Sequence, residues 1–139
     1  MATVFQNDTL FEGNNIIEKQ FQALGDTDQG SLIAINISEL AGPDSNGTAP
    51  STWPAPSKLS LMEITWDVQG FNFVQLLWDA TTADEITYMG GQGYMSFWPI
   101  GGKHDPQSTG FTGDVMLISG GAASADDSYS IRAVFKKKK

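Results

Sequence analysis

The sequence predicts an all-β protein, a single antiparallel β-sandwich of the jelly-roll or immunoglobulin-like type with an extended N-terminal arm. Apolar residues alternate with polar ones at a period of two along most of the chain, and no window of helical length keeps a 3.6-residue period. Turn-forming clusters separate about eight such segments, which is typical of sandwiches. The 139 residues suit one domain with one core, and without cysteine no disulfide can form.

The alternation defines the predicted strands in chain order. They cover residues 17–23, 31–40, 58–68, 71–79, 85–89, 94–98, 114–119 and 128–135. Ile33, Ile35 and Ile37 share one face of the second strand, as in an antiparallel strand with one wet face. Residues 71–78 are apolar on both faces, which predicts a central strand that is covered on both sides. The predicted core comprises Phe21, Ile33, Ile35, Ile64, Trp66, Val74, Leu76, Trp78, Leu117, Ile131 and Phe135.

Two irregular segments are expected to make contacts outside the sandwich. The first is the N-terminal arm, residues 1–15, which is too apolar for a solvated tail. We expect it to pack on a neighbouring subunit or to add a strand to an exposed edge, through Val4, Phe5, Leu10 and Phe11. The second is the loop 41–57, which holds four prolines and Trp53 and is longer than most structureless connections.

Charge divides the chain into an acidic body and a basic end. Residues 1–131 hold three lysines and sixteen carboxylates, a net of −13, whereas residues 132–139 carry +5. The predicted domains are therefore the arm 1–15, the sandwich 16–135 and a basic tail 136–139. We expect the tail to dock on an acidic patch of a partner or of an adjacent copy. Its cations are Arg132, Lys136, Lys137, Lys138 and Lys139.

The same charge distribution makes nucleic acid an unlikely partner, because the acidic body repels phosphate and only four clustered lysines attract it. No apolar run approaches the roughly 18 residues of a membrane span. The first residues lack the basic and apolar regions of an export signal. We therefore expect a protein made in a cytoplasm, with no membrane partner.

Groups suited to catalysis or metal binding are sparse. His104 lies between glycines and a proline and is predicted to be a surface-turn residue. The adjacent pair Asp84-Glu85 points to opposite faces of a strand, and Asp126-Asp127 lies in a turn, so neither predicts acid/base chemistry. The sequence 26–30 resembles the start of a calcium loop but lacks its spacing and its final glutamate. We expect no enzyme, no cofactor and no metal.

The four tryptophans divide into two pairs. Trp66 and Trp78 fall within predicted strands and are expected in the core. Trp53 and Trp98 neighbour prolines, and we expect them to be surface anchors for a partner.

Four parts of the sequence are similar to one group of known proteins. They are the segments 76–82, 112–117 and 126–131, the last of which is followed by the basic end, and the early strand that begins at Asn15. Together they resemble small virion structural proteins of tailed bacteriophages, over about residues 14–135. The resemblance implies a capsid decoration or cement protein that lies outside the phage head and bridges capsomers, with no catalytic residues. Its implied partners are the major capsid protein and neighbouring copies of itself in a homo-oligomer. The loop 41–57 and the stretch 94–110 depart from the pattern of the group.

A second class remains open, a carbohydrate-binding β-sandwich. It would place exposed aromatic residues such as Trp53, Tyr94 and Trp98 on one face, with a possible calcium ion at Asp26 and Asp28. This interpretation explains the tryptophans but not the basic tail.

Overall fold

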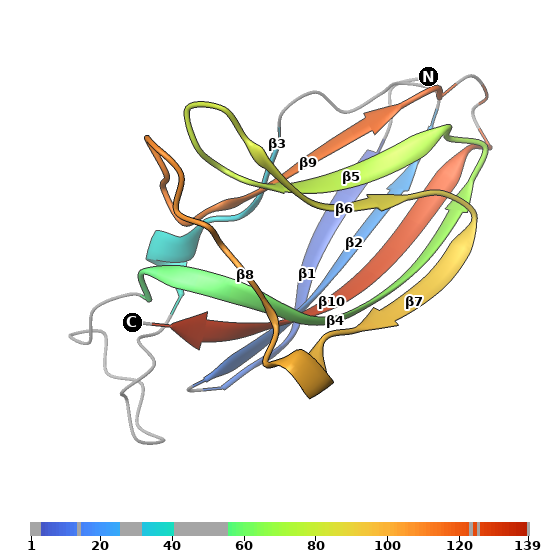
Figure 1. Ribbon diagram of the computed structural model, residues 1–139. Coiled ribbons are helices and arrows are strands. Elements are labelled where there is room, and N and C mark those ends of the chain that lie inside the picture. Colours follow the sequence, from blue (N-terminus) through green and yellow to red (C-terminus); the bar gives the residue numbers. More distant parts are fainter. Residues whose placement is uncertain are drawn as a thin grey trace.

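The computed structural model describes residues 4–13, 15–25, 32–40, 56–122, 124 and 126–138. They form two antiparallel sheets packed face to face (Figure 1), which confirms the predicted all-β sandwich. Sheet A contains, in spatial order, β1 (Val4–Glu12), β2 (Ile16–Leu24), β10 (Ser128–Lys138), β4 (Lys58–Gln69) and β7 (Gln92–Ser96), and β8 (Lys103–His104) also pairs with β4. Sheet B contains β3 (Leu32–Ile35), β9 (Val115–Gly120), β5 (Phe73–Trp78) and β6 (Asp84–Met89). Two 3₁₀ helices complete the described elements, η1 (Ile37–Glu39) and η2 (Trp98–Ile100).

The hydrophobic core lies between the two sheets, and residues at every second position of the strands form it. In β10, which is central in sheet A, Tyr129, Ile131, Ala133 and Phe135 are all buried, and alternation breaks only at Val134, which is also buried and lies at a register shift. The ring of Trp78 from sheet B meets that of Phe135 edge to face at 6.2 Å. The two sheets are thus joined by side chains whose positions the alternation predicted.

Nine of the eleven predicted core residues are buried, and two are not. Ile33 is 49% exposed, because the β3–β9 pairing shifts register between Ile33 and Ile35 and so places both Ala34 and Ile35 inside. Trp66 is only half-buried at the rim of the core. Its Nε1 donates to the carbonyl of Gly90 at 3.1 Å.

The predicted strand 31–40 is wrong in its second half. β3 ends at Ile35, and Asn36 then caps η1 by accepting a hydrogen bond from the backbone N–H of Ser38. The carboxylate of Asp114 accepts the N–H of Ile37 at 2.8 Å. Asparagine favours such a cap over a continued strand because its short side chain bonds to nearby backbone groups.

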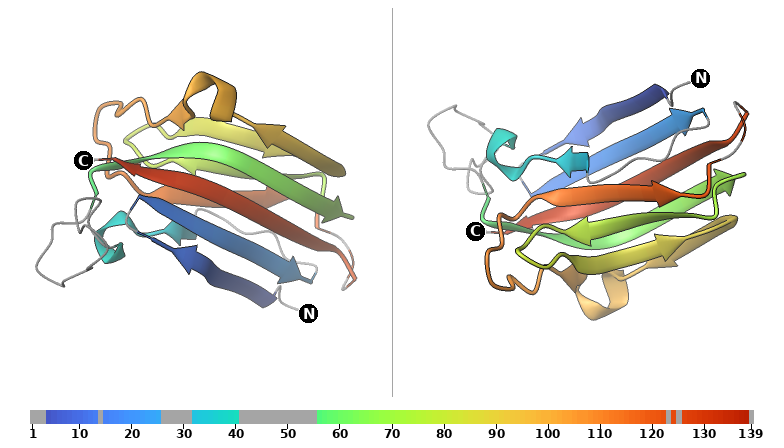
Figure 2. Two further views of the ribbon diagram at one scale, coloured as in Figure 1. Left: turned by 90° about the horizontal axis from the view of Figure 1, so that it is seen from below. Right: turned by 90° about the horizontal axis from the view of Figure 1, so that it is seen from above.

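The predicted N-terminal arm is a strand of the chain's own sheet. β1 pairs antiparallel with β2 from Val4 opposite Leu24 to Glu12 opposite Ile17, and it forms one edge of sheet A (Figure 2). The boundary predicted at residue 15 is therefore a hairpin turn. The Asn7 side chain also donates to the carbonyl of Ala34 in β3 at 2.6 Å, which ties this edge to sheet B.

The predicted tail is also part of a strand. β10 continues to Lys138, where Lys136, Lys137 and Lys138 lie opposite Ser60, Leu59 and Lys58 of β4. The boundary predicted at residue 135 is therefore inside β10. Lys139 and the loop 41–55, with Trp53, lie outside the described residues, as do Asp26 and Asp28.

Candidate interaction surfaces

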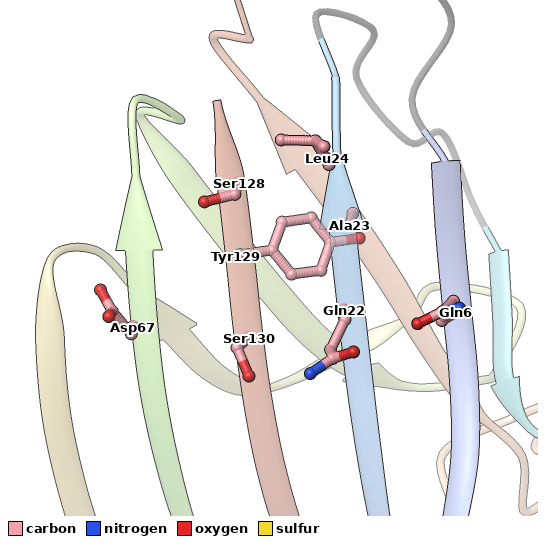
Figure 3. Close-up of a pocket in the computed structure, with 8 residues that line it drawn as sticks. All are labelled: Gln6, Gln22, Ala23, Leu24, Asp67, Ser128, Tyr129 and Ser130. Atoms are coloured by element: carbon pink, nitrogen blue, oxygen red, sulfur yellow. The ribbon is translucent and has the colours of Figure 1, made fainter. Parts of the chain in front are cut away.

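The outer face of sheet A carries a row of polar side chains. Gln6, Gln22, Ser130, Asp67 and Gln92 lie opposite one another across β1, β2, β10, β4 and β7. The first four line a groove of about 480 Å³, in which their side chains form a line across the strands (Figure 3). This surface offers amide, hydroxyl and carboxylate groups for hydrogen bonds.

A second row beside the groove contains Arg132, one of the predicted tail cations. Its Nε donates to Glu18 Oε1 at 2.5 Å, and this hydrogen bond raises the pKa of the guanidinium. In the same row the Tyr94 hydroxyl donates to Glu63 Oε2 at 3.0 Å. Arg132 therefore already has a carboxylate partner within the chain, on an exposed face and apart from the terminal lysines.

The outer face of sheet B is mostly apolar, and the half-buried Gln75 lies on it between Ile118 and Tyr88. Ile33 and Tyr88 are 49% and 58% exposed, and the half-buried Phe73, Met116 and Ile118 share their face. We call these five residues the apolar face. The rings of Phe73 and Tyr88 stack with centroids 5.0 Å apart. Figure 2 (right) looks onto this sheet from outside, and no described strand or helix lies across it.

The predicted anchor Trp98 lies in η2, beyond the end of β7, and is 45% exposed. Ile100 and Met95 beside it are also exposed. Gly101 ends η2 in the left-handed conformation with φ 83°, which glycine adopts without strain. The expected surface position of Trp98 is confirmed, whereas its expected partner is not tested by the fold.

The four predicted contact residues of the arm have different positions in β1. Phe5 is half-buried and packs against the chain's own core, and its contact with a neighbour stays a prediction. Leu10 and Phe11 are exposed at the far end of the strand. Val4 is paired with Leu24, and its side chain lies outside the described set.

The expected contact of the tail with a partner is wrong for Lys137. This residue is 2% exposed, and its ammonium donates to Glu12 Oε2 at 2.7 Å and to the carbonyl of Gly13 at 2.9 Å. Its charge is therefore used inside the chain, at the end of β1. Lys136 is half-buried in the same strand, and nothing is described of the Lys138 side chain.

The ionisable residues show one close contact and one buried carboxyl. His104 is exposed as predicted, but it lies in the short strand β8 and not in a turn, and its Nδ1 is 2.5 Å from Ser60 Oγ. Because Ser60 is fully buried, this hydroxyl does not face solvent. Burial raises the pKa of Asp105, with the charge of Asp84 adding to the effect and the N–H of Gln107 opposing it. Among the described residues, no three His, Cys, Asp or Glu side chains gather in a way that could hold a metal ion.

In the same described part of the chain, no helix is long and apolar enough to cross a membrane. No protein-family model matches the sequence, and no curated protein or solved structure is significantly similar to it.

Two of these features are indicated by the sequence, the apolar outer side of β5 and the inward position of Lys137. The apolar pattern on both faces of residues 71–78 predicted a strand covered on both sides, but β5 is covered on one side only by the described residues. The inward position of Lys137 follows the same alternation that buries Ile131 and Phe135. The polar groove had no signal in the sequence, because it depends on pairing four strands in one register.

Proposed function

We propose that this chain is a non-enzymatic structural protein of a virus particle, a capsid decoration protein that binds the outside of a phage head and bridges capsomers. The observation that carries the proposal is the apolar face of sheet B. Antiparallel sheets of a two-layer sandwich usually turn a polar face to water. Here sheet A does so, and sheet B presents Ile33, Tyr88 and their neighbours.

An apolar patch of this kind marks a surface that another protein covers. Full burial of one large apolar side chain contributes about 1.5–3 kcal/mol. Several partly exposed side chains can therefore hold one copy weakly, and many copies on a lattice reinforce one another through avidity. The proposal of the major capsid protein as partner and of the capsid exterior as location rests on the resemblance of segments 76–82, 112–117 and 126–131 to small virion proteins.

The experiment is an electron-microscopy map of purified particles together with a binding assay on particles that lack the protein. We expect density for the sandwich on the outside of the shell, with sheet B toward the capsomers. Ile33→Gln and Tyr88→Gln should each lower occupancy. Thr65→Gln is the matched control, because Thr65 is exposed on the outer face of sheet A. Density for the protein inside the particle would contradict the proposal, and so would purified particles that contain no copy of the protein.

A second candidate function is carbohydrate binding, which the groove on sheet A favours. Its amide and hydroxyl groups match sugar hydroxyls, and the exposed Tyr94 could stack on a sugar ring from the next row. A glycan array distinguishes the two candidates. Binding that is lost in Gln22→Ala and Tyr94→Ala but kept in Ile33→Gln would favour the sugar-binding function over capsid decoration.

A further inference from the structure

We infer that a second copy of this chain pairs with β1, edge to edge and antiparallel, so that the two copies of sheet A form one continuous sheet about a two-fold axis at Asn7. The inference goes beyond the proposed function and does not depend on it. It rests on the geometry of one strand, β1, and on the side chains along it.

β1 is a long strand, and among the described residues only one side of it is paired. It has nine residues, and β2 pairs with one side of it, while no described strand pairs with the other. From Val4 to Thr9 the pairing with β2 is regular over six consecutive residues. A regular edge of this kind presents a row of backbone N–H and C=O groups that can pair with another chain.

The other edges of the described sheets are less open. β3 has four residues, β7 has five and is followed by η2, and β6 begins with the charged Asp84 and Glu85. Short strands and edge charges are the features that prevent edge pairing. β1 contains no lysine and no proline, and its one bulge, between Thr9 and Phe11, lies beyond the regular part.

The alternation of faces restricts the register of such a pair. Residues that lie opposite each other must point to the same face, so a two-fold axis passes through a residue and not between two residues. An axis at Asp8 would place two carboxylates opposite each other, which is unfavourable. An axis at Asn7 places Gln6 of each copy opposite Asp8 of the other, and an amide can donate to a carboxylate.

The other carboxylate of β1, that of Glu12, does not disfavour this register. Glu12 lies at the end of the strand and accepts a hydrogen bond from Lys137 of its own chain. With the axis at Asn7, Phe5 of one copy lies opposite Thr9 of the other, so the central pairs contain no like charges. The edge is therefore self-complementary in this register.

The test measures the mass of the full chain by light scattering and sedimentation over a range of concentrations. We expect a concentration-dependent dimer of twice 15.0 kDa. Gln6→Asp places two like-charged pairs in the interface and should weaken the dimer about tenfold, whereas Gln6→Lys places opposite charges there and should not weaken it. Gln22→Asp makes the same charge change one strand away, in the same row, and should have a much smaller effect than Gln6→Asp.

Cross-linking tests the register directly, because the chain has no cysteine. An equimolar mixture of Gln6→Cys and Asp8→Cys should form a disulfide-linked pair under oxidation, and neither variant alone should do so. Gln6 and Asp8 are exposed and Gln22 is half-buried on the outer face, so circular dichroism should show an unchanged fold for every variant. A chain that stays monomeric at every concentration, or a dimer unaffected by Gln6→Asp, would overturn the inference. Because the free protein is measured, failure here leaves the particle-binding proposal standing.

Discussion

The ammonium of Lys137 lies 2.7 Å from Glu12 Oε2, which joins the end of β10 to the end of β1 across the intervening β2. The two residues are 125 positions apart in the chain. Segments that the sequence suggested as a free arm and a free tail are thus held together in one sheet. The side chain of Lys137 is fully buried, whereas Glu12 is partly open to water.

Lys137→Gln should therefore destabilise the protein. The change removes a buried charge-assisted hydrogen bond and leaves the Glu12 carboxylate without this ammonium, which we expect to cost about 1.5–3 kcal/mol. Chemical denaturation measures the free energy of unfolding. Lys136→Gln is the control, because Lys136 is its half-buried neighbour, and it should change stability by less than about 0.5 kcal/mol. Equal effects of the two substitutions would contradict a specific role for Lys137.

Trp78→Ala should cost about 3–5 kcal/mol as a large-to-small change in the core. Trp78 is 1% exposed and packs edge to face on Phe135 of the opposite sheet, so its loss leaves a cavity between the layers. Trp98→Ala removes the same side chain from an exposed site and should cost much less. Urea titration of both variants gives the comparison. A cost below about 1 kcal/mol for Trp78→Ala would mean that the two sheets do not pack as described.

Alternation predicted the strands around Leu117 and Ile131, because each sheet has one buried face and apolar residues then recur at every second position of a strand. The same rule failed at Ile33, where a register shift changes which residues point inward. Bulges depend on the partner strand and have no reliable signal in a single sequence.

The two terminal strands differ from the prediction for another reason. In the segment Val4–Glu12 the apolar residues occur as two adjacent pairs, Val4-Phe5 and Leu10-Phe11, and do not alternate with polar residues, so the segment resembles an arm and not a strand. At Lys137 the charge suggested solvent although the alternation pointed inward, and the compensating Glu12 is far away in the sequence. The sequence does not predict the polar groove and the apolar face for the same reason, because each surface arises only when strands far apart in the sequence are paired.

Asp105→Asn should stabilise the protein at neutral pH and flatten part of its pH dependence. Burial raises the pKa of Asp105 above its ordinary value of 3.8, so the folded protein favours the protonated form. The stability from this group is fully present below pH 3.8, and it is lost as pH rises through the higher pKa of the folded state. Asparagine can still accept the N–H of Gln107 that Asp105 Oδ1 accepts at 2.8 Å.

Thermal unfolding of wild type and Asp105→Asn between acidic and neutral pH measures this difference. The stability gained by the variant should grow as pH rises. Asp126→Asn, an exposed turn residue, serves as the control and should give curves parallel to wild type. If Asp105→Asn stabilised the protein most at acidic pH, the pKa of Asp105 would not be raised in the folded protein.

Gly93→Ala should destabilise the protein by about 1–3 kcal/mol through overpacking. A Cβ atom at Gly93 would lie 2.2 Å from the Trp66 ring, so the indole must move and strain its hydrogen bond to Gly90. Gly90→Ala is a close control, because its nearest neighbour would be the Asn72 carbonyl oxygen at an ordinary 3.7 Å. Equal stability of the two variants by denaturant titration would mean that Trp66 does not pack on Gly93.

Deletion of residues 2–12 should unfold the protein or reduce its stability by more than about 3 kcal/mol. The reason is that the deletion removes the whole β1 ladder, the Phe5 side chain on the core and the carboxylate that pairs with buried Lys137. Leaving a buried charge without its partner is by itself costly. Adding Lys137→Met to the deletion removes that charge and should recover part of the loss. Circular dichroism and denaturant titration follow both variants. A deletion variant as stable as the full chain would show that β1 is an appendage and that the sandwich is complete without it.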